Sequence, residues 1–250
     1  MTDIYDTFAD AVADRLAAIK KDMAPIHDAI THVVATVRNN GVVHAFGTGH
    51  SEAFAMEIAG RAGGLIPTNR IPLRDVVLHG TREASALNGS TLERDGTVIE
   101  ELLACHVIDP RDMFIIASNS GVNASIVGMA LAVKKRGLPL VAVTSLDHST
   151  NVPPLHDSGR KLYEIADVVI DNRAPRGDTV LTLEGGAGVG AVSSITAAYI
   201  AQLITIGAAD ALNGPDGQQP PLYLSANIPG GSDHNEKLEA RYQGRIRRDA

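Results

Sequence analysis

The sequence predicts an α/β fold with a parallel sheet. Short apolar runs recur along the 250-residue chain, helical stretches separate them, and polar turns that contain glycine follow two of the runs. Strands that alternate with helices are typical of βαβ units, in which the strands run parallel. The runs are apolar on both faces, as expected for a sheet that helices cover on both sides.

Two helices are expected at the start of the chain. Apolar residues recur at intervals of three and four from residue 3 to residue 38, which is helical spacing. Pro25 divides this stretch in two, because proline inside a helix removes a backbone hydrogen bond and clashes with the preceding turn. Residues 39–41, Asn-Asn-Gly, end the second helix, since glycine and asparagine are common at helix C-termini.

Strands and helices then alternate to residue 212. We expect strands over residues 42–47, 65–69, 113–118, 139–145 and 168–172. We expect helices over residues 52–64, 100–108, 124–136 and 189–212. No internal repeat or low-complexity linker interrupts the pattern, so a single domain over residues 1–250 is predicted. It consists of N-terminal helices (1–41), a core (42–212) and a C-terminal loop with a short helix (213–250).

The composition argues against several classes of function. A net charge of −7 argues against a protein that neutralises a DNA or RNA backbone, and 4% aromatic residues argue against base stacking. The one cysteine, Cys105, excludes an internal disulfide, and the chain has no HExxH or CxxC spacing. We therefore expect no metal and no cofactor.

The sequence also predicts a cytoplasmic protein. We expect no apolar run of the roughly 18 residues that a membrane span needs. Residues 1–16 are acidic and mixed, unlike a signal peptide. No membrane partner and no nucleic-acid partner are expected.

Two polar turns, GTGHS (47–51) and SNSGVNAS (118–125), follow two of the predicted strands. Ligands of open parallel sheets bind outside the carboxyl ends of the strands, where the helix N-termini present free N–H groups. Glycines in such turns let the backbone approach an anion closely. The sequence therefore predicts a phosphate site. Its candidate residues are Gly49, Ser51, Ser118, Asn119, Ser120, Gly121, Asn123, Ser125 and, after a third strand, Ser145.

The two turns also have other interpretations. Ser51, Ser118 and Ser125 could serve only as helix caps, each worth ~1 kcal/mol without any ligand. Two such turns at equivalent strand ends favour binding. Neither turn is a Walker A loop, because no GK[ST] occurs, and GTGHSEAF lacks the third glycine of a dinucleotide fingerprint.

The order of these motifs resembles the sugar isomerase (SIS) domain family, which includes phosphoheptose isomerase and the isomerase domain of glucosamine-6-phosphate synthase. The phosphate loop of that family reads roughly Ser-x-Ser-Gly-x-Thr. Residues 118–123 read SNSGVN, with Asn123 in place of the threonine. The resemblance covers about residues 42–212, and the segments HSTNVPP and SGRKLYEIADVVIDN are similar to a bacterial subgroup of the family.

The resemblance implies a three-layer α/β/α sandwich with a five-stranded parallel sheet. It implies a phosphorylated or similarly anionic sugar as the small-molecule partner, and a homodimer with its sites near the subunit interface. The apolar stretch 189–212 and the N-terminal helices are the expected contacts of that dimer, because a helix that is apolar all round is buried.

Isomerisation of a sugar needs a base for a carbon-bound proton and a group that opens the ring, often a histidine. Glu57 lies about two turns after Ser51, and Glu83 lies in a polar loop, so both are candidate bases. His50 lies in the first turn, and His234 lies in a glycine-rich segment near the C-terminus. The alternative is that Glu57 and Glu83 are solvated and that His234 belongs to a surface loop.

The resemblance to phosphoheptose isomerase also has a departure. It places the histidine of those enzymes near Glu57 and their catalytic acid near Arg61. Three functions therefore stay open. The first is an aldose–ketose isomerase, the second a lyase or etherase on a phosphorylated amino sugar, and the third a non-catalytic sensor of a sugar phosphate.

Overall fold

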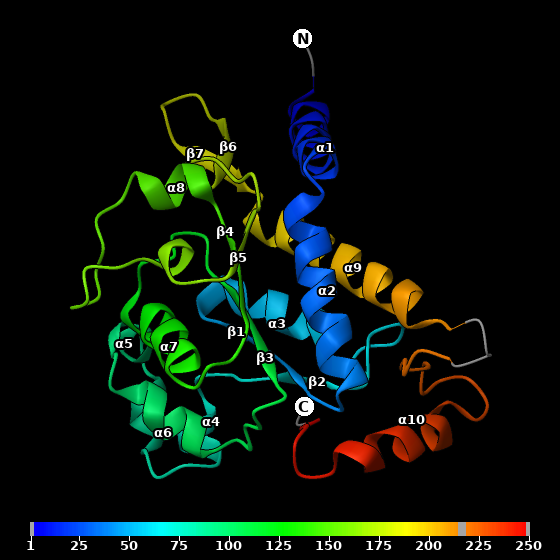
Figure 1. The fold of residues 1–250 in the computed structure, drawn as a ribbon. Helices are drawn as coiled ribbons and strands as arrows, with labels where there is room; N and C mark the ends of the chain where they lie inside the picture. The colour runs from blue at the N-terminus through cyan, green and yellow to red at the C-terminus, as the bar shows by residue number, and fades with distance from the viewer. Residues whose placement is uncertain (1–2, 215–218, 249–250) are drawn as a thin grey trace.

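The computed structural model describes residues 3–214 and 219–248. A five-stranded parallel sheet lies at its centre, with strand order β2-β1-β3-β4-β5 (Figure 1). This confirms the predicted fold class. The strands are β1 (Val43–Gly47), β2 (Thr68–Arg70), β3 (Met113–Ala117), β4 (Leu140–Thr144) and β5 (Val168–Asp171).

The register of the central pair determines where the polar turns lie. β1 and β3 pair over their full length, from Val43 with Met113 to Gly47 with Ala117. Because the strands are parallel and end level, the two turns that follow them leave the sheet side by side at its carboxyl edge.

Helices cover both faces of the sheet. Successive strand residues point to opposite faces, so Ile115 packs into one core and Ile116 into the other. The first face is covered by α1 (Ile4–Lys21), α2 (Ala24–Arg38), α3 (Glu52–Ile58) and α9 (Ser193–Leu212). The second face is covered by α4 (Asp75–Leu78), α5 (Thr91–Arg94), α6 (Val98–Ala104) and α7 (Ala124–Lys135).

The remaining elements are short. They are α8 (Leu146–Thr150), α10 (Gly231–Glu239), the hairpin strands β6 (Thr179–Thr182) and β7 (Gly188–Ala191), and the 3₁₀ turns Gly49–Ser51, Ala84–Leu87, Leu162–Glu164 and Ala240–Tyr242. The break between α1 and α2 falls at the predicted place, since Pro25 lies in the first turn of α2, where its missing N–H costs nothing.

Two strand and helix boundaries differ from the prediction. The strand expected over 65–69 begins at Thr68, because Ile66 donates its backbone N–H to Pro221 and Pro67 has no N–H to give to β1. The helix expected over 189–212 begins at Ser193, because Asp178 accepts the backbone N–H groups of Val192 and Ser193 there.

Two other helices also end early. The helix expected over 52–64 ends at Ile58, and the one expected over 100–108 runs from Val98 to Ala104. Gly60 and Gly63, both with positive φ, leave the helical conformation after α3.

The sequence-based expectation about membrane spans is corrected by α9. Within the described residues it is the one helix that is long and apolar enough to cross a membrane, judged by length and composition alone. In this fold α9 packs against α2 and α3, and Ile200, Ala201 and Ile204 are in the core. Packing against neighbouring helices along its length explains why α9 is so apolar, and no membrane is needed to explain it.

The C-terminal segment lies at the opposite edge of the sheet from the polar turns. Tyr223 and Tyr242 pack against Val42 and Ile66, which precede β1 and β2. Figure 1 shows α10 at one end of the molecule and α8 with the β6–β7 hairpin at the other.

Candidate active site

A narrow hollow opens at the carboxyl ends of β1, β3 and β4, against the start of α9; we call it the strand-end hollow. Three residues of the predicted phosphate site line it, and so do three polar residues that the sequence did not single out. Its lining residues are His50, Ser51, Phe54, Ala117, Ser118, Asn119, Val143, Asn172, Ser193, Ser194 and Ala197.

The first turn contributes His50 and Ser51. A Cβ at Gly47 would lie 2.3 Å from the backbone oxygen of Ser51, so only glycine allows the chain to turn this tightly after β1. The turn then enters α3 within a few residues. Because the turn is short, the Ser51 side chain stays close to the carboxyl end of β1.

The second loop is held by its own hydrogen bonds. The Ser118 hydroxyl accepts the backbone N–H of Gly121 (3.1 Å), and Gly121 has the positive φ, 65°, that this contact needs. The side-chain oxygen of Asn119 accepts from Asn172 (3.1 Å). Ser118 therefore keeps its hydroxyl hydrogen, and Asn119 its NH₂ group, as donors for a ligand.

Ser120 and Asn123 belong to the same loop, but neither lines the strand-end hollow. Both are half-buried, and Asn123 is the N-cap of α7. The loop therefore brings Ser118 and Asn119 to the hollow and leaves Ser120 and Asn123 beside it.

Ser125 and Ser145 are engaged inside the fold. The fully buried Ser125 hydroxyl donates to the backbone oxygen of Glu93 (2.8 Å). The equally buried Ser145 hydroxyl donates to Ala174 (2.6 Å) and accepts from His148 (2.9 Å). Both hydroxyls give their hydrogen to a backbone oxygen and thus hold loops in place.

Glu57 lies one turn further along α3 than Phe54, which lines the hollow. At 1.5 Å per residue this is about 4.5 Å along the helix. Its carboxylate accepts from Gln202 of α9 (2.6 Å) and from Arg61. Two donors thus fix the Glu57 side chain in the groove between α3 and α9.

The other carboxylate candidate is placed differently. Glu83 is exposed at the N-cap of a 3₁₀ turn, Ala84–Leu87, and does not line the strand-end hollow. Glu93 is half-buried, and a Cβ at Gly49 would lie 3.5 Å from its Oε2. Glu93 is thus the carboxylate that faces the glycine turn.

His234 does not reach the strand-end hollow of its own chain. Its ring Nε2 lies 3.0 Å from the backbone oxygen of Leu222, and α10 packs at the amino edge of the sheet. Only a neighbouring subunit's hollow could receive it. Among residues 3–214 and 219–248, no three His, Cys, Asp or Glu side chains gather closely enough to hold a metal ion.

Comparisons with known proteins identify the family of the chain. A sequence model of the SIS domain matches residues 7–145. The UPF0309 protein lmo0025 of Listeria monocytogenes is 38% identical over 242 residues, which is 96% of this chain and 97% of that protein. This chain belongs to the SIS-domain family. A UPF0309 protein of Geobacillus thermodenitrificans is 34% identical to this SIS protein over 244 residues, 97% of this chain and 96% of its own.

Solved structures share the SIS fold at low identity. Phosphoheptose isomerase GmhA from Neisseria gonorrhoeae has a TM-score of 0.53 at 18% identity, covering 81% of this chain and 95% of its own. The Vibrio vulnificus NanR protein complexed with ManNAc-6P has a TM-score of 0.51 at 16% identity, covering 97% of this chain and 69% of its own. These likenesses concern the fold.

Three lining residues were missed by the sequence analysis. Asn172 directly follows β5, so the reasoning that found Ser51 and Ser118 could have been applied to it. Ser193 and Ser194 begin α9, whose position over the strand ends depends on packing between distant segments. No local signal in the sequence indicates that packing.

Proposed function

We propose that this SIS protein binds a phosphorylated sugar in the strand-end hollow and interconverts its aldose and ketose forms. One observation carries the proposal. Ser51, Ser118 and Asn119, which come from two separate turns, meet at one hollow where parallel strands end. Hydroxyl and amide donors in such a place suit a phosphate group.

The hydroxyl and amide donors that line the hollow are of the kinds that bind a phosphate group. The start of α9, with Ser194, faces the same space, and the N-terminus of a helix carries partial positive charge. Ser193 is less available, since its hydroxyl donates to Asp178 (2.6 Å). Ser51, Ser118 and Asn119 are therefore the residues assigned to the phosphate.

The sugar carbons would extend from the phosphate toward Glu57. In the isomerisation the Glu57 carboxylate takes the proton from C2, and that electron pair forms the C1–C2 double bond as the C1 carbonyl oxygen gains a proton. The enediol then gives the proton of its C2 hydroxyl to water, which also supplied the proton at the C1 oxygen, and C1 gains its proton from Glu57. Gln202 and Arg61 hold the carboxylate in position for both transfers.

His50 is the residue assigned to ring opening, because it lines the hollow while His234 lies at the other edge of the same chain. A neutral imidazole can give a proton to the ring oxygen and take one from the anomeric hydroxyl. A ring-opening role for His234 in a partner subunit stays a prediction.

A non-catalytic sensor is the second candidate. Its support is the NanR structure, described as a complex with ManNAc-6P, which shares this fold over most of the chain. A lyase acting on a phosphorylated amino sugar would use the same phosphate donors together with two carboxylates, for which Glu57, held by Gln202, and Glu93, beside Gly49, are candidates.

Proton NMR in heavy water separates the three candidates. A panel of sugar phosphates is incubated with the protein, and the signal of the C2 proton is followed. Loss of that signal with appearance of the ketose supports the isomerase. Release of a substituent supports the lyase, and binding without any reaction supports the sensor.

Two substitutions test the assigned roles. Glu57→Gln should lower kcat by roughly 10²- to 10⁴-fold, the usual contribution of a general base. Ser118→Ala should weaken binding by about 1.5–3 kcal/mol, as expected for a hydrogen bond to a charged group. Glu100→Gln, on the exposed face of α6, serves as the control. Wild-type turnover by Glu57→Gln would remove Glu57 from the mechanism.

A further inference from the structure

A second cavity, of about 390 Å³, lies on the other side of α3, beside the edge strand β2. None of its lining residues lines the strand-end hollow. Its charged lining is Asp75 and five arginines, Arg61, Arg70, Arg74, Arg247 and Arg248. We call it the arginine cavity. Each of these arginines also lies within 4 Å of a carboxylate, from Glu52, Glu57, Asp75 or Glu239, so the cavity offers many guanidinium donors with a small excess of positive charge.

One wall of the arginine cavity comes from β2 and the loop after it. Arg74 donates to Glu52 (2.9 Å), and an Arg70 guanidinium nitrogen lies 3.9 Å from the same carboxylate oxygen. One carboxylate thus holds two guanidinium groups near each other. A guanidinium has five N–H donors, so a single bond to Glu52 leaves most of the donors of Arg74 for a ligand.

The facing wall is the C-terminal tail. A guanidinium nitrogen of Arg247 lies 3.4 Å from Asp75, and another donates to the backbone oxygen of Cys105. Arg248 packs over the ring of Tyr223, 4.9 Å from its centre, and its side chain lies against Gly60 at the end of α3. The two walls therefore present positive charge from segments more than 150 residues apart in the sequence.

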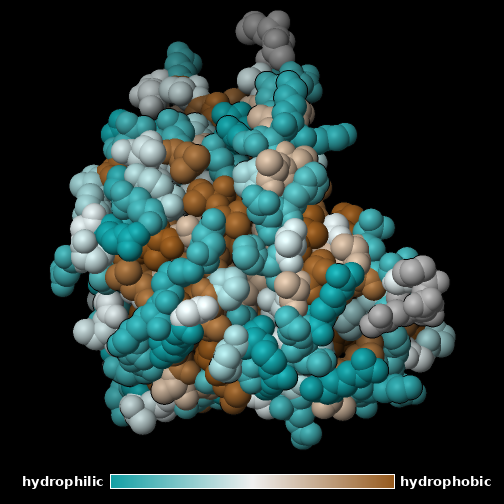
Figure 2. All heavy atoms as spheres, viewed as in Figure 1, coloured by the Kyte–Doolittle hydropathy of each residue, from teal (hydrophilic) through white to brown (hydrophobic). Residues whose placement is uncertain are grey.

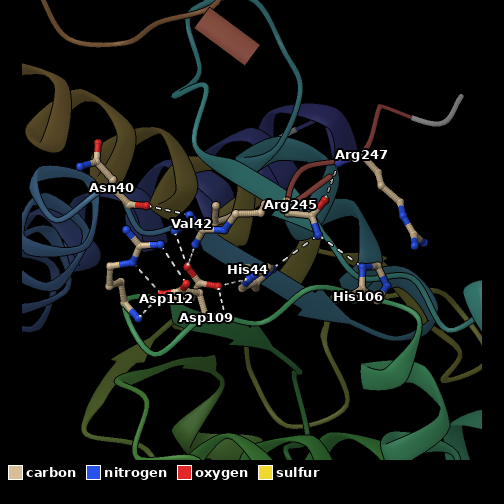
Figure 3. Close-up of polar contacts among 10 residues, drawn as sticks. Asn40, Val42, His44, His106, Asp109, Asp112, Arg245 and Arg247 are labelled. Atoms are coloured by element: carbon tan, nitrogen blue, oxygen red, sulfur yellow. Dashed lines mark hydrogen bonds and ion pairs between the residues drawn. The ribbon is translucent and has the colours of Figure 1, made fainter. Parts of the chain in front are cut away.

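A buried polar network fixes the tail in place (Figure 3). The backbone N–H of Arg247 donates to Asn69 (2.9 Å), whose side chain lies 3.4 Å from both His44 and His106. Arg245 bonds to Asp112 and donates to the backbone oxygen of Asn40 (2.8 Å). Because the tail is tied to buried groups, Arg247 and Arg248 form a built wall of the cavity.

We propose that the arginine cavity binds a small polyanion with two anionic groups, such as a diphosphate or a bisphosphate. One group would meet Arg70 and Arg74, and the other Arg247. Met56, Pro72 and Leu78 also line the space and suit a short carbon skeleton between the two groups. The volume lies within the ~300–1,000 Å³ typical of ligand pockets. This site goes beyond the proposed isomerase site and does not depend on it.

The test uses inorganic pyrophosphate as the probe and isothermal titration calorimetry on the full chain. The strand-end hollow is first disabled by the double substitution Ser118→Ala and Asn119→Ala. Pyrophosphate should still bind to this variant. Adding Arg74→Gln should weaken that binding at least tenfold, and adding Arg247→Gln should do the same from the other wall.

Arg136→Gln is the matched control. Arg136 forms an ion pair with a glutamate at 2.8 Å, as Arg74 does at 2.9 Å. Arg136 lies at the C-terminus of α7, outside the arginine cavity. This substitution should leave the affinity unchanged. Thermal melting of each variant checks that it is folded. If Arg247→Gln disturbs the fold of the C-terminal tail, the pyrophosphate affinity of the Arg74→Gln variant alone still tests the proposal.

Three results would overturn the proposal. The first is that pyrophosphate does not bind once the strand-end hollow is disabled. The second is that the Arg74→Gln and Arg136→Gln variants bind pyrophosphate with equal affinity. The third is that both of these variants lose affinity for pyrophosphate. The proposed isomerase is judged separately, since pyrophosphate binding by the disabled variant is independent of any sugar turnover by the wild type.

Discussion

His44 and Asp112 form a fully buried pair at the amino ends of β1 and β3, with 3.0 Å between Nε2 and Oδ2. Burial lowers the pKa of His44 from its ordinary value, and the bond to Asp112 only partly offsets this. Burial alone would raise the pKa of Asp112, yet its bonds to His44 and to the backbone of Asp109 and Val42 hold it below the usual range. The histidine is therefore neutral and the aspartate charged at neutral pH.

This pair predicts a loss of stability on mild acidification. Below its ordinary pKa of ~6.5, His44 takes up a proton in the unfolded chain but not in the fold, so acid favours unfolding. Between pH 7.5 and 5.5 this group should cost up to about 1.4 kcal/mol. Denaturant unfolding at the two pH values measures the difference.

His44→Gln should lower stability at both pH values but reduce the difference between them. His27→Gln, on the exposed face of α2, is the control and should keep the wild-type difference. An undiminished difference in His44→Gln would mean that other groups cause the acid sensitivity.

At the same scale, the sequence predicted site residues that directly follow strands, but not those whose position depends on the packing of distant segments. Ser51, Ser118 and Asn119 directly follow strands, and parallel strands bring their ends together without further information. Whether Ser125 faces a ligand or the Glu93 backbone depends on the packing of a distant loop. Local sequence does not encode that choice.

At the scale of elements, strands with long apolar runs were predicted to within a residue or two. β3 was expected over 113–118 and observed over 113–117. The β6–β7 hairpin was missed, because its strands are mostly exposed and carry little apolar signal. The sequence predicts a helix from residue 189, inside β7 (Gly188–Ala191), since Val189 and Ala191 also suit a helix.

The first turn is the element on which the strand-end hollow depends most, and Gly47→Ala tests it. The added Cβ would lie 2.3 Å from the backbone oxygen of Ser51, so the turn must move and carry Ser51 and His50 away from the hollow. We expect at least a tenfold loss of sugar-phosphate affinity, measured by calorimetry.

Gly96→Ala is the matched control for that substitution. A Cβ at Gly96 meets nothing closer than 3.7 Å, which is ordinary contact, and the residue lies outside the strand-end hollow. Its affinity should equal that of the wild type. Unchanged affinity in Gly47→Ala would show that the turn does not position the ligand donors.

On the scale of the whole molecule, the carboxyl and amino ends of the strands differ in what covers them. The carboxyl edge carries the strand-end hollow, and the amino edge is closed by the C-terminal segment, which reaches from α10 along β2 (Figure 1). β2 is an edge strand, and an uncovered edge offers free backbone groups to other chains. Arg248 binds the backbone oxygens of Ile66 and Thr68 there, so the tail protects this edge as well as lining the arginine cavity.

Among the residues that the structure describes, α9 carries an apolar strip that is partly exposed. On α9, Ile195 and Ile206 are 40% and 62% exposed, and eleven residues, about three turns, place them on the same face. Gln202, which holds Glu57, lies between them on that face. On the side shown in Figure 2, brown apolar residues are visible beside α2, over the region of α9. We predict that this strip forms the homodimer contact, which would place the partner subunit next to Glu57.

Ile206→Asp tests the homodimer, because a charge in an apolar contact is costly to bury. Sedimentation at micromolar concentration should give twice the chain mass of 26.3 kDa for the wild type and a single chain mass for Ile206→Asp. Leu155→Asp, at a similarly exposed apolar residue (59%) in the loop after α8, should stay dimeric. Wild-type protein that sediments near 26.3 kDa would refute the dimer. If Ile206→Asp is monomeric and also loses turnover while still binding sugar phosphate, the partner subunit completes the site around Glu57.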